Sequence, residues 1–165
     1  MNIQIQIIGE PDFKKIEASR RAIAHDHARK FAILDLGDTL GCYGLSWRSE
    51  FVEPIVELSS DEQTVWLGVD QQVAAICLFQ GKIRLSLALN SNLIQILNRD
   101  RLTAVLTADE VLLFNPDFSI RLIKGLPDLA EEIVMVNESG LEIRLMSGKS
   151  LFVDTQTGAL LSTVA

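Results

Sequence analysis

The chain has too little cysteine for a disulfide-stabilised fold. Its 165 residues contain only Cys42 and Cys77, and Cys77 lies in an apolar segment, where it is expected to be a small buried hydrophobic residue. Histidine is equally scarce, with only His25 and His27 in the chain, and the sequence contains no Gly-x-Ser-x-Gly or phosphate-loop motif. The sequence therefore presents no nucleophile with a recognisable base.

Long apolar runs and basic segments are also missing. No stretch approaches the roughly 20 apolar residues that a membrane-spanning helix needs. The first eight residues alternate between polar and apolar, without the basic start and long apolar core of a signal peptide. The net charge of −7 repels phosphate backbones. We expect a cytoplasmic protein that binds neither a membrane nor nucleic acid.

Apolar residues, in contrast, are abundant. They make up 48% of the chain, and the mean hydropathy is +0.24. The length suits one domain, and apolar surface beyond the needs of its core is typically buried between subunits. We therefore expect a homo-oligomer, most simply a dimer, with a protein partner of unknown identity and no cofactor.

A repeat dominates the last two thirds of the sequence. Apolar stretches separated by short polar clusters occur three times, and Val73, Val111 and Leu151 occupy corresponding places at intervals of about 40 residues, the period of propeller-type arrays. Each unit contains four short strands. Because the turns between the strands are too short for helical crossovers, the strands are expected to be antiparallel. The units run over residues 51–89, 90–128 and 129–165.

The third unit ends in a turn with a familiar pattern. Asp154-Thr-Gln-Thr-Gly158 follows an apolar strand and resembles the x-D-x-x-T-G corner of quinoprotein-type and related β-propeller blades. The resemblance covers residues 51–165 and concerns the blade style alone, because the other two units have different residues at this turn. It implies a mostly β protein, either all-β or α+β, built from successive four-stranded antiparallel, blade-like sheets. It implies no specific family and no activity.

The first 50 residues lack this repeat and are predicted to form a strand–helix–strand segment. Residues 2–8 and 31–36 are predicted strands, and Phe13–Lys30 is a predicted helix with Asp12 as its N-cap. Residues 37–50 are expected to form a loop. This segment supplies no clean fourth unit, whereas propellers close with four to eight blades.

Three arrangements could complete such a fold. The N-terminal strands could form an irregular extra sheet. Two chains could join into a six-bladed ring. The sheets could also pack as an ordinary sandwich or barrel.

Two short motifs could carry chemistry. Phe31–Leu40 resembles the first motif of haloacid-dehalogenase-type phosphatases, which implies Asp35 as nucleophile and Mg²⁺ ligand. In that family the general acid stands two residues after the nucleophile. This chain has Gly37 at that position, and the acidic residue comes one position later, at Asp38. His25 and His27 could bind a metal, but two such side chains on one helix point apart.

Aromatic residues around the predicted loop suggest a binding role. Tyr43, Trp47 and Phe51 cluster there and could anchor a protein partner, whereas Trp66 lies within a strand and is expected in the core. The sequence is best explained by a non-enzymatic protein-interaction or assembly module. Two alternatives stay open: a metal-dependent hydrolase with a site near Asp35 and Asp38, and a small acidic inhibitor or immunity-type regulator.

Overall fold

Within the part of the chain that the structure describes, the fold is built from sixteen strands and two short helical segments. A computed structural model describes residues 2–164, with side chains through residue 159. The elements are β1 (Gln4–Ile8), α1 (Glu10–Lys14), the 3₁₀ helix η1 (Ala18–Arg20), β2 (Arg21–Ile23), β3 (Lys30–Asp35), β4 (Cys42–Trp47), β5 (Ile55–Leu58), β6 (Thr64–Val69), β7 (Gln72–Cys77), β8 (Lys82–Ala88), β9 (Leu93–Arg99), β10 (Leu102–Thr107), β11 (Glu110–Phe114), β12 (Ile120–Gly125), β13 (Ala130–Asn137), β14 (Gly140–Leu145), β15 (Ser150–Asp154) and β16 (Leu160–Val164).

These strands form four sheets of four strands each. Sheet A has the order β1-β3-β4-β2, sheet B runs from β5 to β8, sheet C from β9 to β12, and sheet D from β13 to β16. All pairs are antiparallel except β2 with β4. The predicted four-stranded antiparallel sheets are therefore confirmed, and sheets B, C and D lie within residues 51–165. Among the described residues, no helix has the length and apolarity to cross a bilayer.

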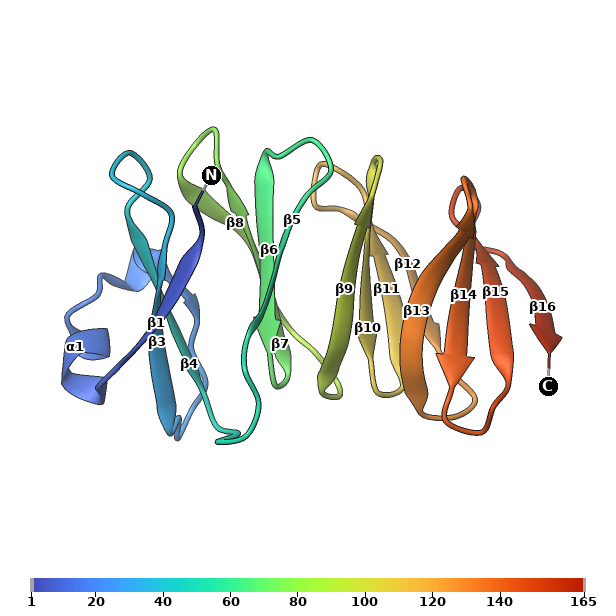
Figure 1. Cartoon of the computed structure of the whole chain (residues 1–165), viewed down its shortest axis with the longest axis horizontal. Helices are drawn as coiled ribbons and strands as arrows, with labels where there is room; N and C mark the ends of the chain where they lie inside the picture. Colours follow the sequence, from blue (N-terminus) through green and yellow to red (C-terminus); the bar gives the residue numbers. More distant parts are fainter. Residues whose placement is uncertain (1, 165) are drawn as a thin grey trace.

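The sheets stack face to face in chain order, with sheets A and D at opposite ends (Figure 1). The first strands of the sheets, β1, β5, β9 and β13, lie along one side of the stack, and we call them the inner strands. The seven turns at residues 36–41, 59–63, 78–81, 100–101, 115–119, 138–139 and 155–159 gather at what we call the upper end of the stack, and the remaining loops gather at the lower end (Figure 1).

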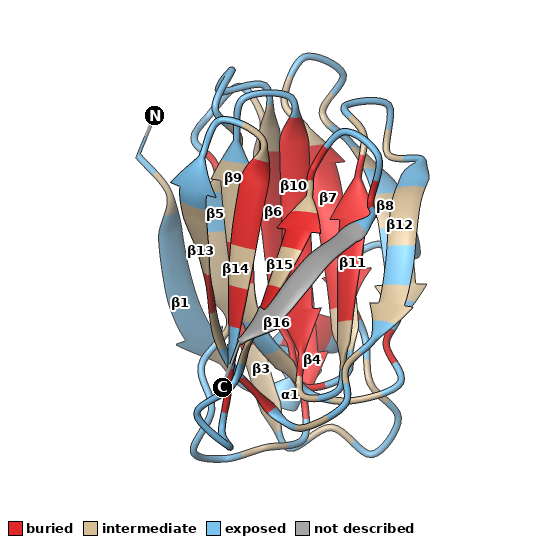
Figure 2. Ribbon diagram, turned by 90° about the vertical axis from the view of Figure 1, so that its right-hand side faces the viewer, coloured by how far each residue is buried: buried red, intermediate tan, exposed pale blue. Residues whose placement is uncertain are grey.

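Side chains of adjacent sheets fill the three spaces between them. One apolar cluster lies between sheets A and B, a second between B and C, and a third between C and D. The central strands β6, β7, β10 and β11 are buried along most of their length (Figure 2). Their sequences are nearly continuous apolar runs, as is typical of strands that are buried on both faces. Trp66 of β6 is 2% exposed, which confirms its predicted place in the core.

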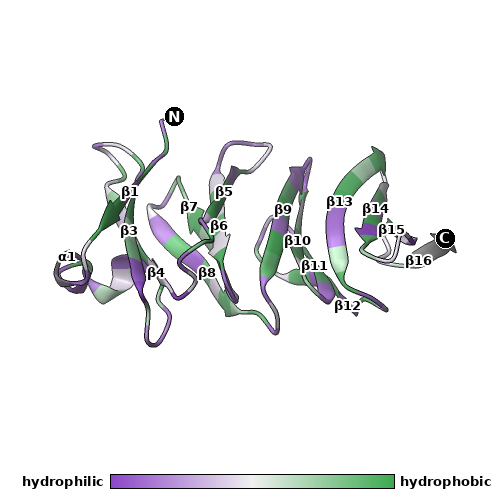
Figure 3. Cartoon of the chain, turned by 60° about the horizontal axis from the view of Figure 1, so that its bottom comes forward, coloured by the Kyte–Doolittle hydropathy of each residue, from purple (hydrophilic) through white to green (hydrophobic). Residues whose placement is uncertain are grey.

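Sheet D, unlike sheets B and C, has a neighbouring sheet on only one face, and within the described residues no helix packs on its other face. In β14, Leu141, Ile143 and Leu145 are buried, whereas Glu142 and Arg144 lie on the other face. Arg144 donates to Glu142 at 2.7 Å and to Glu132 of β13 at 2.6 Å. The alternation of β14 is that of a strand with one solvated face, and β13 also carries a hydrophilic stretch (Figure 3).

Sheet A corrects the expectation for residues 1–50, because it supplies a fourth unit. The predicted helix Phe13–Lys30 is wrong. The helix ends at Lys14, and Arg21–Ile23 forms strand β2, which pairs with β4 in parallel. The guanidinium of Arg21 donates to the carbonyls of Lys14 and Ile16 and so satisfies backbone acceptors where the helix ends.

The α1 segment lies on the outer face of sheet A, away from sheet B, where it contacts β3 and β4 (Figure 1). The ring of Phe13 packs on Phe31 of β3, with 5.4 Å between centroids. Gly44 of β4 permits this contact, because a Cβ there would lie 3.0 Å from side-chain atoms of both Phe13 and Ile16. At this end of the stack, the short α1 helix packs on sheet A in the position that a neighbouring sheet occupies elsewhere.

Two glutamine side chains join adjacent sheets by pairing with backbone. The amide of Gln95 in β9 donates to the carbonyl of Ile133 in β13 and accepts from its N–H, both at 3.0 Å. Gln72 of β7 makes the same pair of contacts with Ala24, which follows β2. Each amide bonds a backbone donor and a backbone acceptor of the neighbouring sheet or of the segment that follows its strand, and so fixes the position of one sheet against the next.

Candidate functional site

Of the aromatic residues predicted to bind a partner, two are buried and one is exposed. Tyr43 and Trp47 lie in β4 and point into the cluster between sheets A and B, where they are 0% and 1% exposed. The indole N–H of Trp47 donates to the carbonyl of Val52 at 3.0 Å. Phe51, in the loop after β4, is 99% exposed. Of the three predicted anchors, only Phe51 is on the surface of this chain.

The hydroxyl of Tyr43 holds a turn of the neighbouring sheet. It donates to the carbonyl of Gly81 at 2.8 Å, and the guanidinium of Arg20 lies over its ring at 4.3 Å. Gly81 belongs to the turn between β7 and β8, at a φ of +62° that favours glycine. The turn is therefore fixed from both sheets.

This turn also carries an exposed aromatic residue that was not among the predicted anchors. Phe79 is 91% exposed at the upper end of the stack. The preceding residue, Leu78, donates its backbone N–H to the carbonyl of Gln63, and this bond places Phe79 beside the turn 59–63. Hydrophobic periodicity does not indicate a role for Phe79, because the residue lies in a turn. The one sequence feature that could have indicated an exposed aromatic residue is its position between an apolar strand and a glycine.

The predicted hydrolase residues lie at the turn between β3 and β4. Asp35 is exposed, and one carboxylate oxygen accepts from Gly37 N at 2.9 Å. Asp38 is exposed within the turn. Burial raises the pKa of the Cys42 thiol, and the charge of Asp35 raises it further. In the part of the chain that the structure describes, no three His, Cys, Asp or Glu side chains are grouped closely enough to hold a metal.

His25 and His27 are not brought together. His25 is half-buried, with Nδ1 at 2.8 Å from the carbonyl of Ser46, whereas His27 is exposed at a φ of +56°. His25 lines a pocket of about 170 Å³ at the lower end, together with Ser49 and Asp70. Its Nε2 is buried without a hydrogen-bond partner among the described residues.

Asp70 is the buried carboxylate of this lower pocket. It is 9% exposed and accepts from the backbone N–H groups of Arg48 and Ser49, at 2.8 and 3.1 Å. Burial alone would raise the pKa of Asp70, but hydrogen bonds from Ser49 and Arg48 and the nearby His25 outweigh it and hold the pKa below its usual value. Asp70 thereby ties the loop after β4 to sheet B.

In the described part of the lower pocket, no hydrogen bond joins the hydroxyl of Ser49 to the ring of His25. A serine nucleophile needs a hydrogen bond to its base, and in the described structure Ser49 bonds Asp70 while Nδ1 of His25 contacts Ser46. The pocket's contacts serve to hold sheets A and B together.

A second pocket opens at the upper end between sheets B and C. It has a volume of about 110 Å³ and is lined by Trp66, Phe118, Asn98 and Asp61, among others. Hydrogen bonds from Ser59 and Gln63 hold the pKa of Asp61 below its usual value. Phe118 has a φ of +70°, which is rare for a bulky residue and marks local backbone strain. The upper end therefore combines an exposed aromatic residue, a strained turn and an open pocket.

Comparison with known proteins identifies the architecture but no family. No family model matches the chain, and no curated protein matches it. The solved structure of BamB from Moraxella catarrhalis matches 90% of this chain and 49% of its own, at 15% identity and a TM-score of 0.59. The C-terminal WD40 domain of Sif2 matches 81% of this chain and 42% of its own, at 13% identity and a TM-score of 0.57.

A third structure gives the same result. The WD40 domain of Neurospora crassa Pan2 matches 66% of this chain and 36% of its own, at 12% identity and a TM-score of 0.55. The chain thus spans less than half the length of each of these three structures. The shared feature is the propeller-like arrangement of four-stranded sheets.

Proposed function

We propose that this stack of four propeller-like sheets is a protein-interaction module that binds its partner across the upper end. The observation that carries the proposal is Phe79, a phenylalanine side chain that is 91% exposed at the tip of a turn. Burying such a side chain against a partner contributes about 1.5–3 kcal/mol. Aromatic residues of this kind are common anchors of protein interfaces.

The turn that carries Phe79 is already ordered. Gly81 N donates to the carbonyl of Cys77 at 2.8 Å, and Tyr43 of sheet A holds the carbonyl of Gly81. An anchor on a fixed turn loses little freedom on binding, so more of the contact energy appears as affinity. Rigid sheets that present loops at one end are a common support for binding sites.

The proposal is tested by photocrosslinking from defined positions. A photoreactive phenylalanine analogue is placed at position 79 in one sample and at position 51 in another, and both are irradiated in extract of the source cells. We expect position 79 to capture one discrete protein, and we expect Phe79→Ala to lower recovery of that protein about tenfold, because the anchor is lost.

Position 51 is the matched control, since Phe51 is also almost fully exposed but lies at the lower end. Capture of a discrete protein from position 51 alone would overturn the upper-end assignment and favour the site predicted from the sequence. A protein captured from position 79 whose recovery is unchanged by Phe79→Ala would also contradict the proposal.

Self-association is a separate expectation from the composition, and the inner strands offer support for it. Ile7 of β1, Ile94 of β9 and Val136 of β13 are exposed along that side of the stack. We expect light scattering to show a dimer, and Ile7→Lys to raise the dissociation constant about tenfold, because a charge replaces buried apolar area. Ile123→Lys on the outer strand β12 is the control. A monomer at every concentration would refute the expectation.

A further inference from the structure

Three arginines surround a cavity between sheets C and D at the upper end. The cavity has a volume of about 240 Å³, and Arg99, Arg101 and Arg121 line it together with the carboxylates of Asp100 and Glu138. Arg99 ends β9, Arg101 stands in the following turn, and Arg121 belongs to β12. The fold thus brings together guanidinium groups from two separate parts of sheet C.

Arg121 is fixed in place at this cavity. Its Nε donates to the side-chain carbonyl of Asn115 at 2.6 Å, and one terminal nitrogen donates to the backbone carbonyl of Thr155 at 2.7 Å. The second contact crosses from sheet C to sheet D. A guanidinium has five N–H groups, so others remain for a ligand after these two bonds. Because the side chain is already ordered, it loses little entropy when it binds.

None of the three arginines forms a close ion pair within the described part of the chain, although the charge of Arg101 adds to the hydrogen bonds that lower the pKa of Asp61. The ion pairs there involve only Lys14, Lys15 and Arg144 as cations. This is unexpected in a chain with 22 acidic and 15 basic residues, where carboxylates are plentiful. At the cavity itself, three guanidinium groups face two carboxylates, which leaves an excess of positive charge for an incoming anion.

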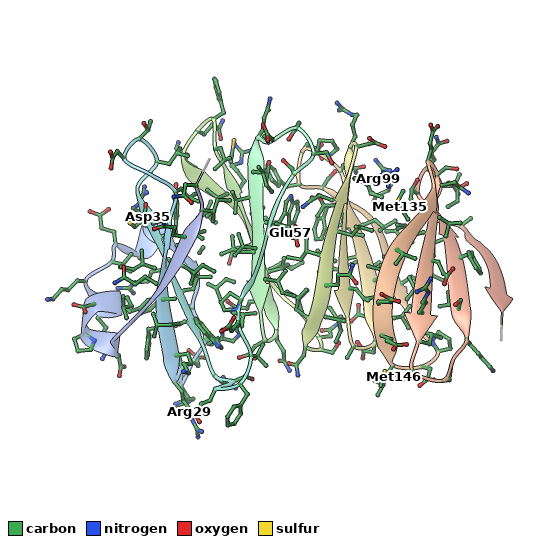
Figure 4. The ribbon with its side chains drawn as sticks, in the orientation of Figure 1. Arg29, Asp35, Glu57, Arg99, Met135 and Met146 are labelled. Carbon is green, nitrogen blue, oxygen red and sulfur yellow. The ribbon has the colours of Figure 1, made fainter. Side chains whose placement is uncertain are left out.

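The cavity also has an apolar part. Leu102 and Met135 line it, and Met135 is partly buried against the core between sheets C and D. Figure 4 shows Met135 near Arg99 at the upper end, while Arg29 lies at the opposite end of the molecule. A ligand with an aliphatic chain that ends in a negatively charged oxygen group would complement this combination of apolar and guanidinium surface.

We propose that this cavity binds a glutamate side chain from an acidic segment of a protein partner. The carboxylate accepts charge-assisted hydrogen bonds from Arg121 and from Arg99 or Arg101, in the bidentate geometry that guanidinium groups favour. The methylene groups of the glutamate lie against Leu102 and Met135. The inference rests on the proposed function, because the glutamate is presented by the protein partner, and it adds the chemistry of the segment that binds.

The test uses a fluorescein-labelled synthetic peptide of alternating glycine and glutamate, titrated with the full chain at low ionic strength and followed by anisotropy. We expect Arg99→Gln with Arg101→Gln to weaken binding about tenfold or more. Arg121→Lys keeps the charge but loses the planar fork, and we expect a similar loss. Arg29→Gln with Lys149→Gln makes the same charge change at the lower end and should change affinity less than about twofold, the small effect expected of exposed charges far from the site.

Several results would overturn the inference. Equal weakening by the lower-end pair would mean diffuse attraction, without a site. Displacement of the peptide by equimolar inorganic phosphate would indicate a small-ion site, and binding of oligothymidine with the same arginine dependence would indicate a nucleic-acid surface. Unchanged thermal midpoints of the variants confirm that folding is intact. A partner captured at position 79 without peptide binding would overturn this inference while the proposed function stands.

Discussion

Trp47→Ala is expected to destabilise the fold by about 3–5 kcal/mol, the usual cost of truncating a large buried aromatic residue. Trp47 is 1% exposed and fills the space between sheets A and B. Its removal leaves a cavity there and leaves the carbonyl of Val52 without the indole donor. Urea unfolding measures the loss as a lower midpoint at an unchanged slope.

Phe51→Ala is the matched control for this prediction, since it truncates a nearby aromatic residue that is 99% exposed. We expect it to change the free energy of unfolding by less than about 0.5 kcal/mol, as for most surface substitutions. A small effect of Trp47→Ala would contradict its place in the core and would return Trp47 to the set of exposed partner anchors.

Asp70→Ala should produce the second large loss of stability, about 2–3 kcal/mol, because two backbone N–H groups lose a buried charged acceptor. Asp70 also has a φ of +53°, a conformation that alanine tolerates poorly. Asp100 shares this backbone conformation, at +52°, but is exposed. Asp100→Ala therefore isolates the backbone contribution, and equal losses in the two variants would refute the role assigned to the Asp70 carboxylate.

The contribution of Asp70 is expected to depend on pH. Its pKa in the folded state lies below the unfolded value of about 3.9, so the folded protein binds the proton more weakly than the unfolded chain. The stabilisation is complete well above that pH and is lost as the pH falls through the lowered pKa. The difference in unfolding free energy between wild type and Asp70→Asn should therefore shrink below about pH 4. A difference that is constant from pH 7 to pH 3 would be inconsistent with an ionised Asp70.

The strands of sheets B, C and D could be predicted because local pattern and tertiary environment agree there. Thr64–Val69 and Leu102–Thr107 are short apolar runs bounded by turn residues, and both are central strands with buried faces. The alternation in Leu141–Leu145 likewise matches a strand with one solvated face. In these segments the sequence constrains each strand without reference to distant residues.

Sheet A was harder to predict because distant contacts determine it. Residues 21–23 carry no strand alternation of their own, and they become β2 because β4 offers them a free edge. The loop expected at residues 37–50 contains β4, in which Tyr43, Leu45 and Trp47 repeat with a period of two. That period predicts a buried face, but the intervening glycine and serine made the segment read as a loop.

The arginine cavity could not have been predicted from spacing. Arg99 and Arg101 are close in the sequence, but Arg121 joins them only because β9 and β12 belong to one sheet and Thr155 of sheet D fixes the guanidinium. Phe79 shows the same limitation, since its exposure depends on how the turn between β7 and β8 is held from sheet A. Both features arise from contacts between sheets.

The α1 segment gives the stack a direction. Because α1 lies over β3 and β4 on the outer face of sheet A, a further sheet packed on those strands would have to displace that segment. A further sheet packed directly on sheet D would instead bury the Glu132–Arg144–Glu142 network, and it would have to bury this network whole, since a partly paired buried charge is costly. A ring made from two copies would have to displace α1 twice, whereas side-by-side pairing through the inner strands leaves both ends of each stack unchanged.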